Sequence, residues 1–204
     1  MPSVTRRSRG HRERREEIDE RVLDTTADLL SDGEGFTQLS VERIAAAADV
    51  SRSTFYVHFA DKSDLLLRLA ARAMDDLRDA LDRWWARRRS GDDRALTECM
   101  LRVIDAYRAH ATVLAAVGEV AGYDPAVATV WRARVDRYAR RLRLELEEDR
   151  RRGVIGAGLD VEVAPFVVTW SIERTVAEHV RSSSPTEDRA LARALSHFCR
   201  STYA

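Results

Sequence analysis

The chain has 204 residues, of which 33% are charged and 45% are hydrophobic, and its 34 basic side chains balance 34 acidic ones. This composition is typical of a soluble globular protein and excludes disordered, collagen-like and uniformly basic chains. The longest uncharged stretches, such as Val163–Ile172, have 10 residues and are too short to cross a bilayer. No apolar segment follows the N-terminal arginines, and the two cysteines lie 100 residues apart. We therefore expect no signal peptide, no disulfide framework, no metal site and a cytoplasmic location.

The charges are unevenly distributed, because residues 1–15 carry six arginines and one glutamate. This segment has a net charge of +5, so the other 189 residues sum to −5. Residues 1–13 show no apolar periodicity, which predicts a disordered basic arm. Such an arm is either a solubilising tail or a contact to DNA, since arginine suits phosphates and narrow minor grooves.

Helical spacing of apolar residues recurs throughout the first 88 residues. It predicts a helix at 14–31, short helices at 41–48 and 52–59, and a long helix from 61 to about 88. Suitable N-caps precede the last three helices at Ser40, Ser51 and Asp61.

The rest of the chain continues with helices separated by glycine-, proline- and serine-containing turns. They are expected at 93–109, 111–121, 125–152, 160–181 and 186–202. Pro125 suits a first helical turn, whereas Pro165 leaves the start of the fourth of these helices open. The sequence therefore predicts an all-α chain of about nine helices. A three-helix domain at 14–60 would precede a helical bundle at 61–204, with 61–88 as the connecting helix.

The stretch SVERIAAAADVSRSTFYVHFADKSDL, from Ser40 to Leu65, matches a helix-turn-helix. The positions where its two helices must touch are occupied by Ile44, Ala45, Val50 and Phe55. Asp49 occupies the turn position that usually has a positive φ, which Asp tolerates better than most residues. The second helix carries no acid and is rich in hydrogen-bonding side chains, namely Arg52, Ser53, Thr54, Tyr56 and His58. Such side chains reach base edges and phosphates, so we expect this helix to bind double-stranded DNA.

Lys62, the only lysine of the chain, lies in the first turn of the long helix. The helix dipole disfavours a cation there. Two interpretations remain open: a local ion pair with Asp61 or Asp64, or a lysine held at a helix N-terminus to bind a DNA phosphate.

The segment VSRSTFYVHFADKSDLL closely resembles the helix-turn-helix signature of the tetracycline-repressor (TetR) family. Tyr56, Phe59 and Lys62 fall on that pattern, whereas the usual turn glycine is Asp49 here. The resemblance covers residues 14–70 and, beyond them, rests on helix count and order. It implies DNA contacts near the backbone by Ser40 and Arg43, base reading by Arg52, Ser53 and Thr54, and phosphate contacts by Tyr56, His58 and Lys62.

Residues 93–204 contain no GxSxG, P-loop or HExxH motif, so we expect no enzyme activity and no cofactor. Instead, apolar and aromatic stripes run along the long helices and would form either a core or the wall of a ligand cavity. Glu173 interrupts one of these stripes with a carboxylate. It is either exposed, paired with an arginine or waiting for a donor from a ligand.

The helix order also resembles the TetR family, whose larger domain binds a small inducer and dimerises. More narrowly, Ile172–Thr175 and the helix containing Trp131 resemble the ethionamide-resistance repressor subgroup. This resemblance implies an elongated, largely apolar tunnel lined by Leu96, Val103, Tyr107, Trp131, Val135, Tyr138, Thr169, Ile172 and Glu173. A dimer interface through the last two helices would use Val168, Ile172, Thr175, Leu191, Leu195 and Phe198; the alternative for these residues is packing within one chain.

The expected function is that of a bacterial, ligand-responsive transcriptional repressor. It would bind a palindromic operator as a homodimer and be released by a small, largely apolar inducer. One alternative is a DNA-binding protein of the same fold without an inducer, which a void-free bundle would support. The other is a helical carrier or enzyme with a vestigial helix-turn-helix, which would bind an apolar molecule but not DNA.

Overall fold

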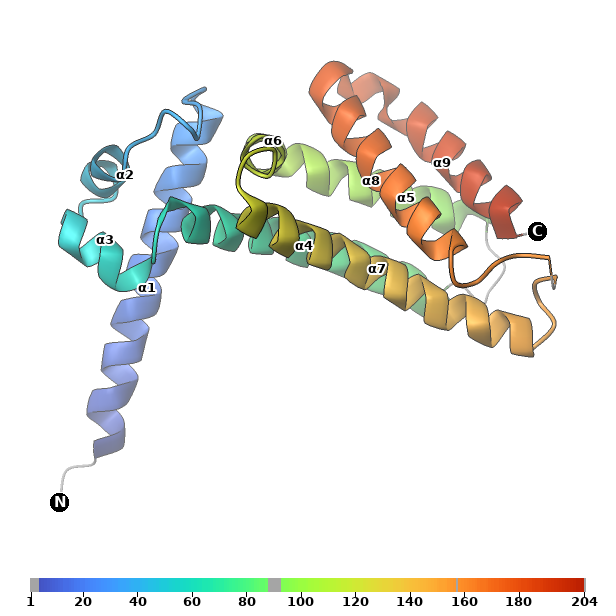
Figure 1. The fold of residues 1–204 in the computed structure, drawn as a ribbon, viewed down its shortest axis with the longest axis horizontal. Helices are drawn as coiled ribbons and strands as arrows, with labels where there is room; N and C mark the ends of the chain where they lie inside the picture. The colour runs from blue at the N-terminus through green and yellow to red at the C-terminus, as the bar shows by residue number, and fades with distance from the viewer. Residues whose placement is uncertain (1–3, 88–92, 157, 204) are drawn as a thin grey trace.

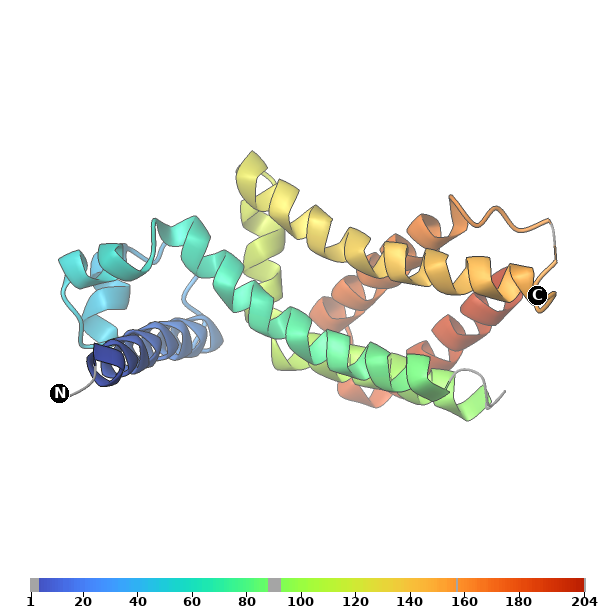
Figure 2. The same ribbon diagram turned by 90° about the horizontal axis from the view of Figure 1, so that it is seen from below.

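The computed structural model describes residues 4–87, 93–156 and 158–203, and all regular elements in these ranges are helices. Three helices form a small N-terminal domain: α1 (Val4–Ser31), α2 (Val41–Ala47) and α3 (Arg52–His58). The long α4 (Lys62–Arg87) leads from this domain into a larger one, as Figures 1 and 2 show from two directions. The larger domain contains α5 (Asp93–Ala109), α6 (Ala111–Val120), α7 (Pro125–Arg151), α8 (Ala164–Ser182), a 3-10 turn (Pro185–Glu187) and α9 (Asp188–Tyr203). The expected all-α fold with nine α-helices is confirmed for the described ranges.

Side-chain caps explain why the short helices begin where the sequence predicts. The Ser40 hydroxyl accepts a hydrogen bond from the backbone N–H of Arg43 (3.1 Å), and the Ser51 hydroxyl accepts one from Thr54 (2.9 Å). Asp49 has a φ of 52°, so the turn between α2 and α3 uses the left-handed conformation expected at this position. Asp124 caps α7 by accepting from the N–H groups of Ala126 and Val127, ahead of a first-turn proline.

Two helix starts differ from the sequence prediction. Helix α1 begins at Val4 rather than at residue 14, so residues 4–13 extend the helix instead of forming a disordered arm; residues 1–3 lie outside the described ranges. Arginine and glutamate are good helix formers, and Arg12 lies 3.9 Å from Glu16 one turn later. Helix α8 begins at Ala164 rather than at residue 160, because the Asp160 carboxylate accepts backbone N–H groups in a separate turn before it.

The hydrophobic core has two parts, and α4 and the α6–α7 corner contribute to both. The first part joins the N-terminal domain to α6 and the start of α7, with Phe55, Phe59 and Leu66 packed in the same cluster as Val117 and Val127. The second part fills the larger domain between α4, α5, α7, α8 and α9. A domain boundary between residues 60 and 61 stays a prediction, and the first half of α4 packs with the smaller domain. No helix in the described part of the chain combines the length and the apolar character that crossing a membrane requires.

Candidate DNA-binding surface and ligand cavity

The surface of α3 presents the side chains that the sequence predicted for base reading. Arg52, Ser53 and Tyr56 are exposed, and Thr54 is half-buried, whereas Phe55 and Phe59 are fully buried in the core beneath them. The exposed face also contains Val57, of which 67% is exposed, and the sequence analysis did not include it. The sequence did contain a signal for Val57, because it follows Tyr56 on a seven-residue helix that was predicted to face DNA. A valine side chain is suited to contact with a thymine methyl group.

The exposed cation of α3, Arg52, contacts two residues of its own domain. Arg52 forms an ion pair with Glu42 of α2, and its guanidinium lies 5.7 Å from the centre of the Tyr56 ring. The pKa of Arg52 is raised, mainly by a hydrogen bond with the Tyr56 side chain and next by the negative charge of Glu42. The Ser51 hydroxyl lies 2.8 Å from that of Ser53 and 2.7 Å from that of Thr54. The polar groups of this face are therefore arranged before any DNA is bound.

His58 does not lie on this surface, which corrects the phosphate contact predicted for it. Only 7% of the residue is exposed, and its Nδ1 lies 2.5 Å from Oδ1 of Asp19 on α1. Arg68 of α4 donates to the backbone oxygen of His58 (2.9 Å) and to Asp19 (3.3 Å). The reason is helical spacing, since His58 lies three residues after the buried Phe55. His58 therefore joins α3 to α1 and α4.

Lys62 also has a structural role that the sequence analysis did not predict. Its Nζ donates to the backbone oxygens of Phe36 (2.7 Å), Thr37 (3.3 Å) and Leu39 (2.6 Å), and it lies 4.8 Å from the Phe36 ring centre. Burial lowers the pKa of Lys62, opposed by Glu119. An ammonium group has three N–H donors, so all three are engaged within the protein. This geometry supports neither a phosphate contact nor an ion pair with the neighbouring aspartates.

Ser40 and Arg43, predicted near the DNA backbone, lie on the exposed first turn of α2. Ser40 caps that helix, and Arg43 pairs with Glu34 at 2.7 Å. Because both remain at the surface, their contact with phosphates stays a prediction.

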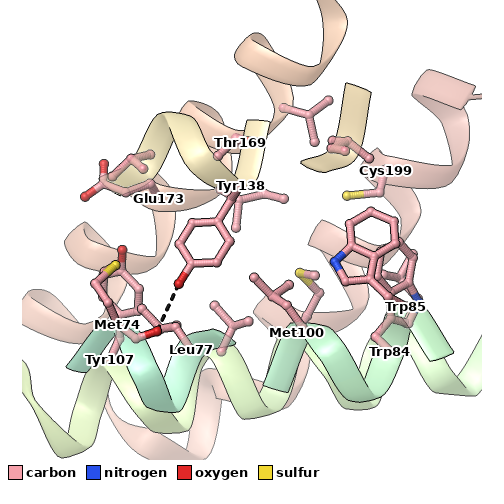
Figure 3. Close-up of a pocket in the computed structure, with 17 residues that line it drawn as sticks. Met74, Leu77, Trp84, Trp85, Met100, Tyr107, Tyr138, Thr169, Glu173 and Cys199 are labelled. Atoms are coloured by element: carbon pink, nitrogen blue, oxygen red, sulfur yellow. Dashed lines mark hydrogen bonds between the residues drawn. The ribbon is translucent and has the colours of Figure 1, made fainter. Parts of the chain in front are cut away.

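The larger domain contains a partly open cavity of about 110 Å³ between α4, α5, α7, α8 and α9. For comparison, an apolar protein cavity of roughly 150 Å³ holds benzene. Figure 3 shows its lining, which extends from Glu173 and Tyr107 at one end to Trp84 and Trp85 at the other. Eight of the nine residues predicted to contact a ligand line the cavity: Leu96, Val103, Tyr107, Val135, Tyr138, Thr169, Ile172 and Glu173.

The ninth residue, Trp131, is a correction. It is half-buried on α7 and packs against both parts of the core instead of lining the cavity. The whole α4 wall and four other lining side chains were not predicted from the sequence. These residues are Met74, Leu77, Leu81, Trp84, Trp85, Met100, Leu142, Val168 and Cys199. The apolar stripe on α4 was visible in the sequence, but a stripe alone does not show whether its neighbours fill the space beside it.

Polar groups are few among the lining side chains. The Tyr138 hydroxyl donates to the backbone oxygen of Met74 (2.9 Å), the dashed line in Figure 3. Glu173 is only 8% exposed, and its Oε2 has no hydrogen-bond partner; the nearest cation, Nε of Arg174, is 4.0 Å away. Burial raises the pKa of Glu173, partly opposed by Arg174, and raises the pKa of Tyr107 well above its ordinary value. Of the three possibilities for Glu173, exposure is excluded, and Arg174 lies at the limit of an ion pair, at 4.0 Å, but too far away for a hydrogen bond.

Both cysteines are buried free thiols. Burial raises the pKa of Cys99 to about 12 and that of Cys199 to about 11, so neither has the thiolate character of a reactive cysteine. Within the described residues, no group of histidine, cysteine, aspartate or glutamate side chains is arranged to hold a metal ion.

The six residues predicted for a dimer interface divide into two groups. Val168 and Leu195 are buried within one chain, Ile172 and Leu191 are half-buried against the same core, and Val168 and Ile172 line the cavity. For these four, packing within one chain is the role that the structure supports. Thr175 and Phe198 are exposed, and so are two further apolar side chains at the start of α8, Phe166 and Val167. The helical hairpin α8–α9 therefore does present an apolar face to solvent, but with a different set of residues.

Replacing Glu173 with glutamine is expected to stabilise the ligand-free protein by about 1 kcal/mol at neutral pH, because a neutral amide costs less to bury than a carboxylate. The folded-state pKa of Glu173 is raised, so the wild type loses stability as the pH rises from the unfolded pKa through the folded one. The difference between the two proteins should accordingly vanish in acid. Urea unfolding at several pH values measures it, with the exposed Glu98→Gln as control; equal stability at every pH would contradict a destabilising burial of this carboxylate.

An exposed helix of a helix-turn-helix on a small helical domain, joined by one long helix to a domain with an apolar cavity, is the arrangement expected of a helix-turn-helix regulator. Residues 22–69 match the family model described as bacterial regulatory proteins, tetR family. The N-terminal part of this chain is therefore similar to the bacterial regulatory proteins of the TetR family.

Several solved structures share the fold over nearly the whole chain. GusR from Salmonella enterica has a TM-score of 0.70 at 21% identity, covering 92% of this chain and 95% of that one. FadR from Bacillus subtilis, solved in complex with stearoyl-CoA, has a TM-score of 0.69 at 19% identity, covering 91% and 99%. PfmR from Thermus thermophilus has a TM-score of 0.64 at 21% identity, covering 87% and 92%. The search of curated proteins gave no match.

Proposed function

We propose that this regulator is a ligand-responsive transcriptional repressor that binds a palindromic operator as a homodimer and is released by a small, largely apolar inducer. The observation that carries the proposal is the continuity of α4. At the N-terminal end of α4, Lys62 binds the loop between α1 and α2 of the N-terminal domain. At the C-terminal end, Trp84 and Trp85 form part of the cavity wall. A ligand that moves α4 would therefore move the DNA-binding surface.

On the DNA side, Arg52, Ser53, Thr54, Tyr56 and Val57 would enter a major groove. Two copies related by a two-fold axis would place two such helices on two half-sites, which requires a palindromic operator. The exposed apolar face of α8–α9, with Phe166, Val167 and Phe198, supports a dimer through these helices.

Polar contacts at the α6–α7 corner offer a second route between the two domains. The Thr37 hydroxyl donates to Glu119 (2.6 Å) and lies 3.4 Å from the Tyr123 hydroxyl, and the Ser63 hydroxyl donates to Asp124 (2.8 Å). Helix α7 also contributes Val135, Tyr138 and Leu142 to the cavity. An inducer must bind the conformation that does not fit the operator more tightly than the one that does, since otherwise no population shifts.

The cavity favours this proposal over a same-fold protein without an inducer, which a void-free bundle would support. Its free volume of about 110 Å³ is suited to a compact ligand in the present conformation. A long acyl chain, such as the one bound to Bacillus subtilis FadR, would require the lining to move apart. The finer likeness to ethionamide-resistance repressors stays a prediction, because the regulators compared above are others.

The test begins with a duplex selected from a random pool by the full-length protein, which should be palindromic. Toluene is then titrated while intrinsic tryptophan fluorescence reports the cavity and a shift assay reports operator affinity. We expect toluene to quench the fluorescence of Trp84 and Trp85 and to lower operator affinity by at least about fivefold. The cavity-filling variant Val103→Phe should lose both responses and still bind the operator. Toluene binding with unchanged operator affinity would favour the alternative without an inducer.

A further inference from the structure

The cavity has a single carboxyl group, at one end of a largely apolar lining. Of the 17 residues that line it, Glu173 is the only one with a carboxylate, and no lysine, arginine or histidine is among them. In Figure 3, Glu173 and Tyr107 lie at the end opposite Trp84 and Trp85. A ligand that fills this space therefore meets one acidic group and a long apolar wall.

One oxygen of the Glu173 carboxylate lacks the hydrogen bond that a buried acid normally has. Its Oε2 is inaccessible to solvent and accepts no hydrogen bond. Nε of Arg174 lies 4.0 Å away on a side chain that is 78% exposed, so this arginine points its charge mainly to solvent. Tyr138 is not available as a donor, because its hydroxyl already donates to Met74. The folded protein therefore holds a desolvated acceptor for which no donor is provided.

The remaining wall is suited to a cation attached to an apolar body. Trp84 and Trp85 have ring centres 4.3 Å apart, and Tyr107 and Tyr138 add two further rings. Tyr107 lies at the Glu173 end, where its ring attracts a cation most strongly when water is excluded, whereas Trp84 and Trp85 at the opposite end offer apolar area to the rest of the ligand. A carboxylate ligand would instead face like-charge repulsion from Glu173 in a medium where charges interact strongly.

We infer that the ligand class of this cavity is a hydrophobic amine, whose protonated nitrogen donates a hydrogen bond to Glu173 while its apolar body packs toward Trp84 and Trp85. The inference rests on the proposed role of the cavity as the inducer site. Because the protein already bears the desolvation of the carboxylate, an arriving ammonium group gains a charge-assisted hydrogen bond without that part of the usual penalty. A ligand that places a carboxylate beside Glu173 is disfavoured by like-charge repulsion.

The experiment compares four probes of nearly equal size on the full-length protein: benzylamine, benzyl alcohol, toluene and benzoate. Binding is followed by tryptophan fluorescence and by calorimetry at neutral pH. We expect benzylamine to bind about tenfold more tightly than benzyl alcohol or toluene, and benzoate not to bind. In Glu173→Gln, the affinity for benzylamine should fall about tenfold, while the affinities for benzyl alcohol and toluene should change by less than about twofold.

The control is Glu98→Gln, which removes an exposed carboxylate from the lining helix α5 and should leave all four affinities unchanged. Equal affinities for benzylamine, benzyl alcohol and toluene would overturn the inference but leave an apolar inducer site intact. An amine preference that persists in Glu173→Gln would overturn it as well, because another group would then hold the nitrogen. If no probe binds, both the inference and the proposed inducer site fail.

Discussion

Replacing Lys62 with methionine is expected to lower the free energy of unfolding by about 2–4 kcal/mol. The ammonium group is the donor for the backbone oxygens of Phe36, Thr37 and Leu39, and methionine keeps the length of the side chain but no donor. Phe36 and Leu39 are buried, so water does not readily replace the lost hydrogen bonds. The measurement is urea unfolding followed by circular dichroism, in which the midpoint should fall at an unchanged slope.

The matched control is Arg43→Met, which also removes one cation from the same domain. Its guanidinium pairs with the half-exposed Glu34, and exposed ion pairs contribute little to stability. We expect this variant to change the free energy of unfolding by less than about 0.5 kcal/mol. If Lys62→Met kept its stability and instead lost operator affinity with a flatter salt dependence, Lys62 would be a phosphate contact after all.

The positions of the helices could be predicted because the signals that start them are local. The capping side chains accept hydrogen bonds from backbone N–H groups only two or three residues further on, as at Ser40, Ser51 and Asp124. Both partners therefore lie within one short segment of the sequence. The start of α8 was missed for a related reason. Asp160 makes equally local hydrogen bonds, but they close a turn that ends before the helix begins.

The roles of Lys62 and His58 could not be predicted, because their partners are distant in the sequence. Lys62 reaches residues 23 to 26 positions before it, and His58 reaches Asp19, 39 positions before it. A polar residue on a DNA-binding helix looks the same in a sequence whether it faces DNA or its own domain. The family resemblance did not resolve this choice, since it assigned both residues to phosphates.

Only part of the cavity lining could be predicted from the sequence, and the reason is physical. Stripes on α5, α7 and α8 identify side chains that face inward, and eight of the nine named residues do line the space. Whether inward-facing side chains meet or leave a void depends on how far apart the helices lie, and periodicity carries no information about that distance. The opposite wall from α4 therefore became visible only in the structure.

The double variant Arg52→Ala, Tyr56→Ala is expected to weaken binding to the selected operator by at least about a hundredfold. Both side chains are exposed on α3, and the arginine lies over the tyrosine ring, so they present one surface to the groove. Neither is part of the buried core, so the free energy of unfolding should change little. A shift assay and calorimetry at several salt concentrations would measure the loss and separate base contacts from phosphate contacts.

Glu42→Gln provides the matched control, because its expected effect has the opposite sign. In the free protein Glu42 pairs with Arg52 and competes with DNA for the same guanidinium. Removing this carboxylate should raise operator affinity by about twofold to fivefold, the range that an exposed ion pair supplies. If Arg52 instead serves only to hold α2 against α3, Glu42→Gln should destabilise the domain and weaken DNA binding together. Whether operator affinity rises or falls in Glu42→Gln therefore decides whether Arg52 binds DNA or only stabilises its own domain.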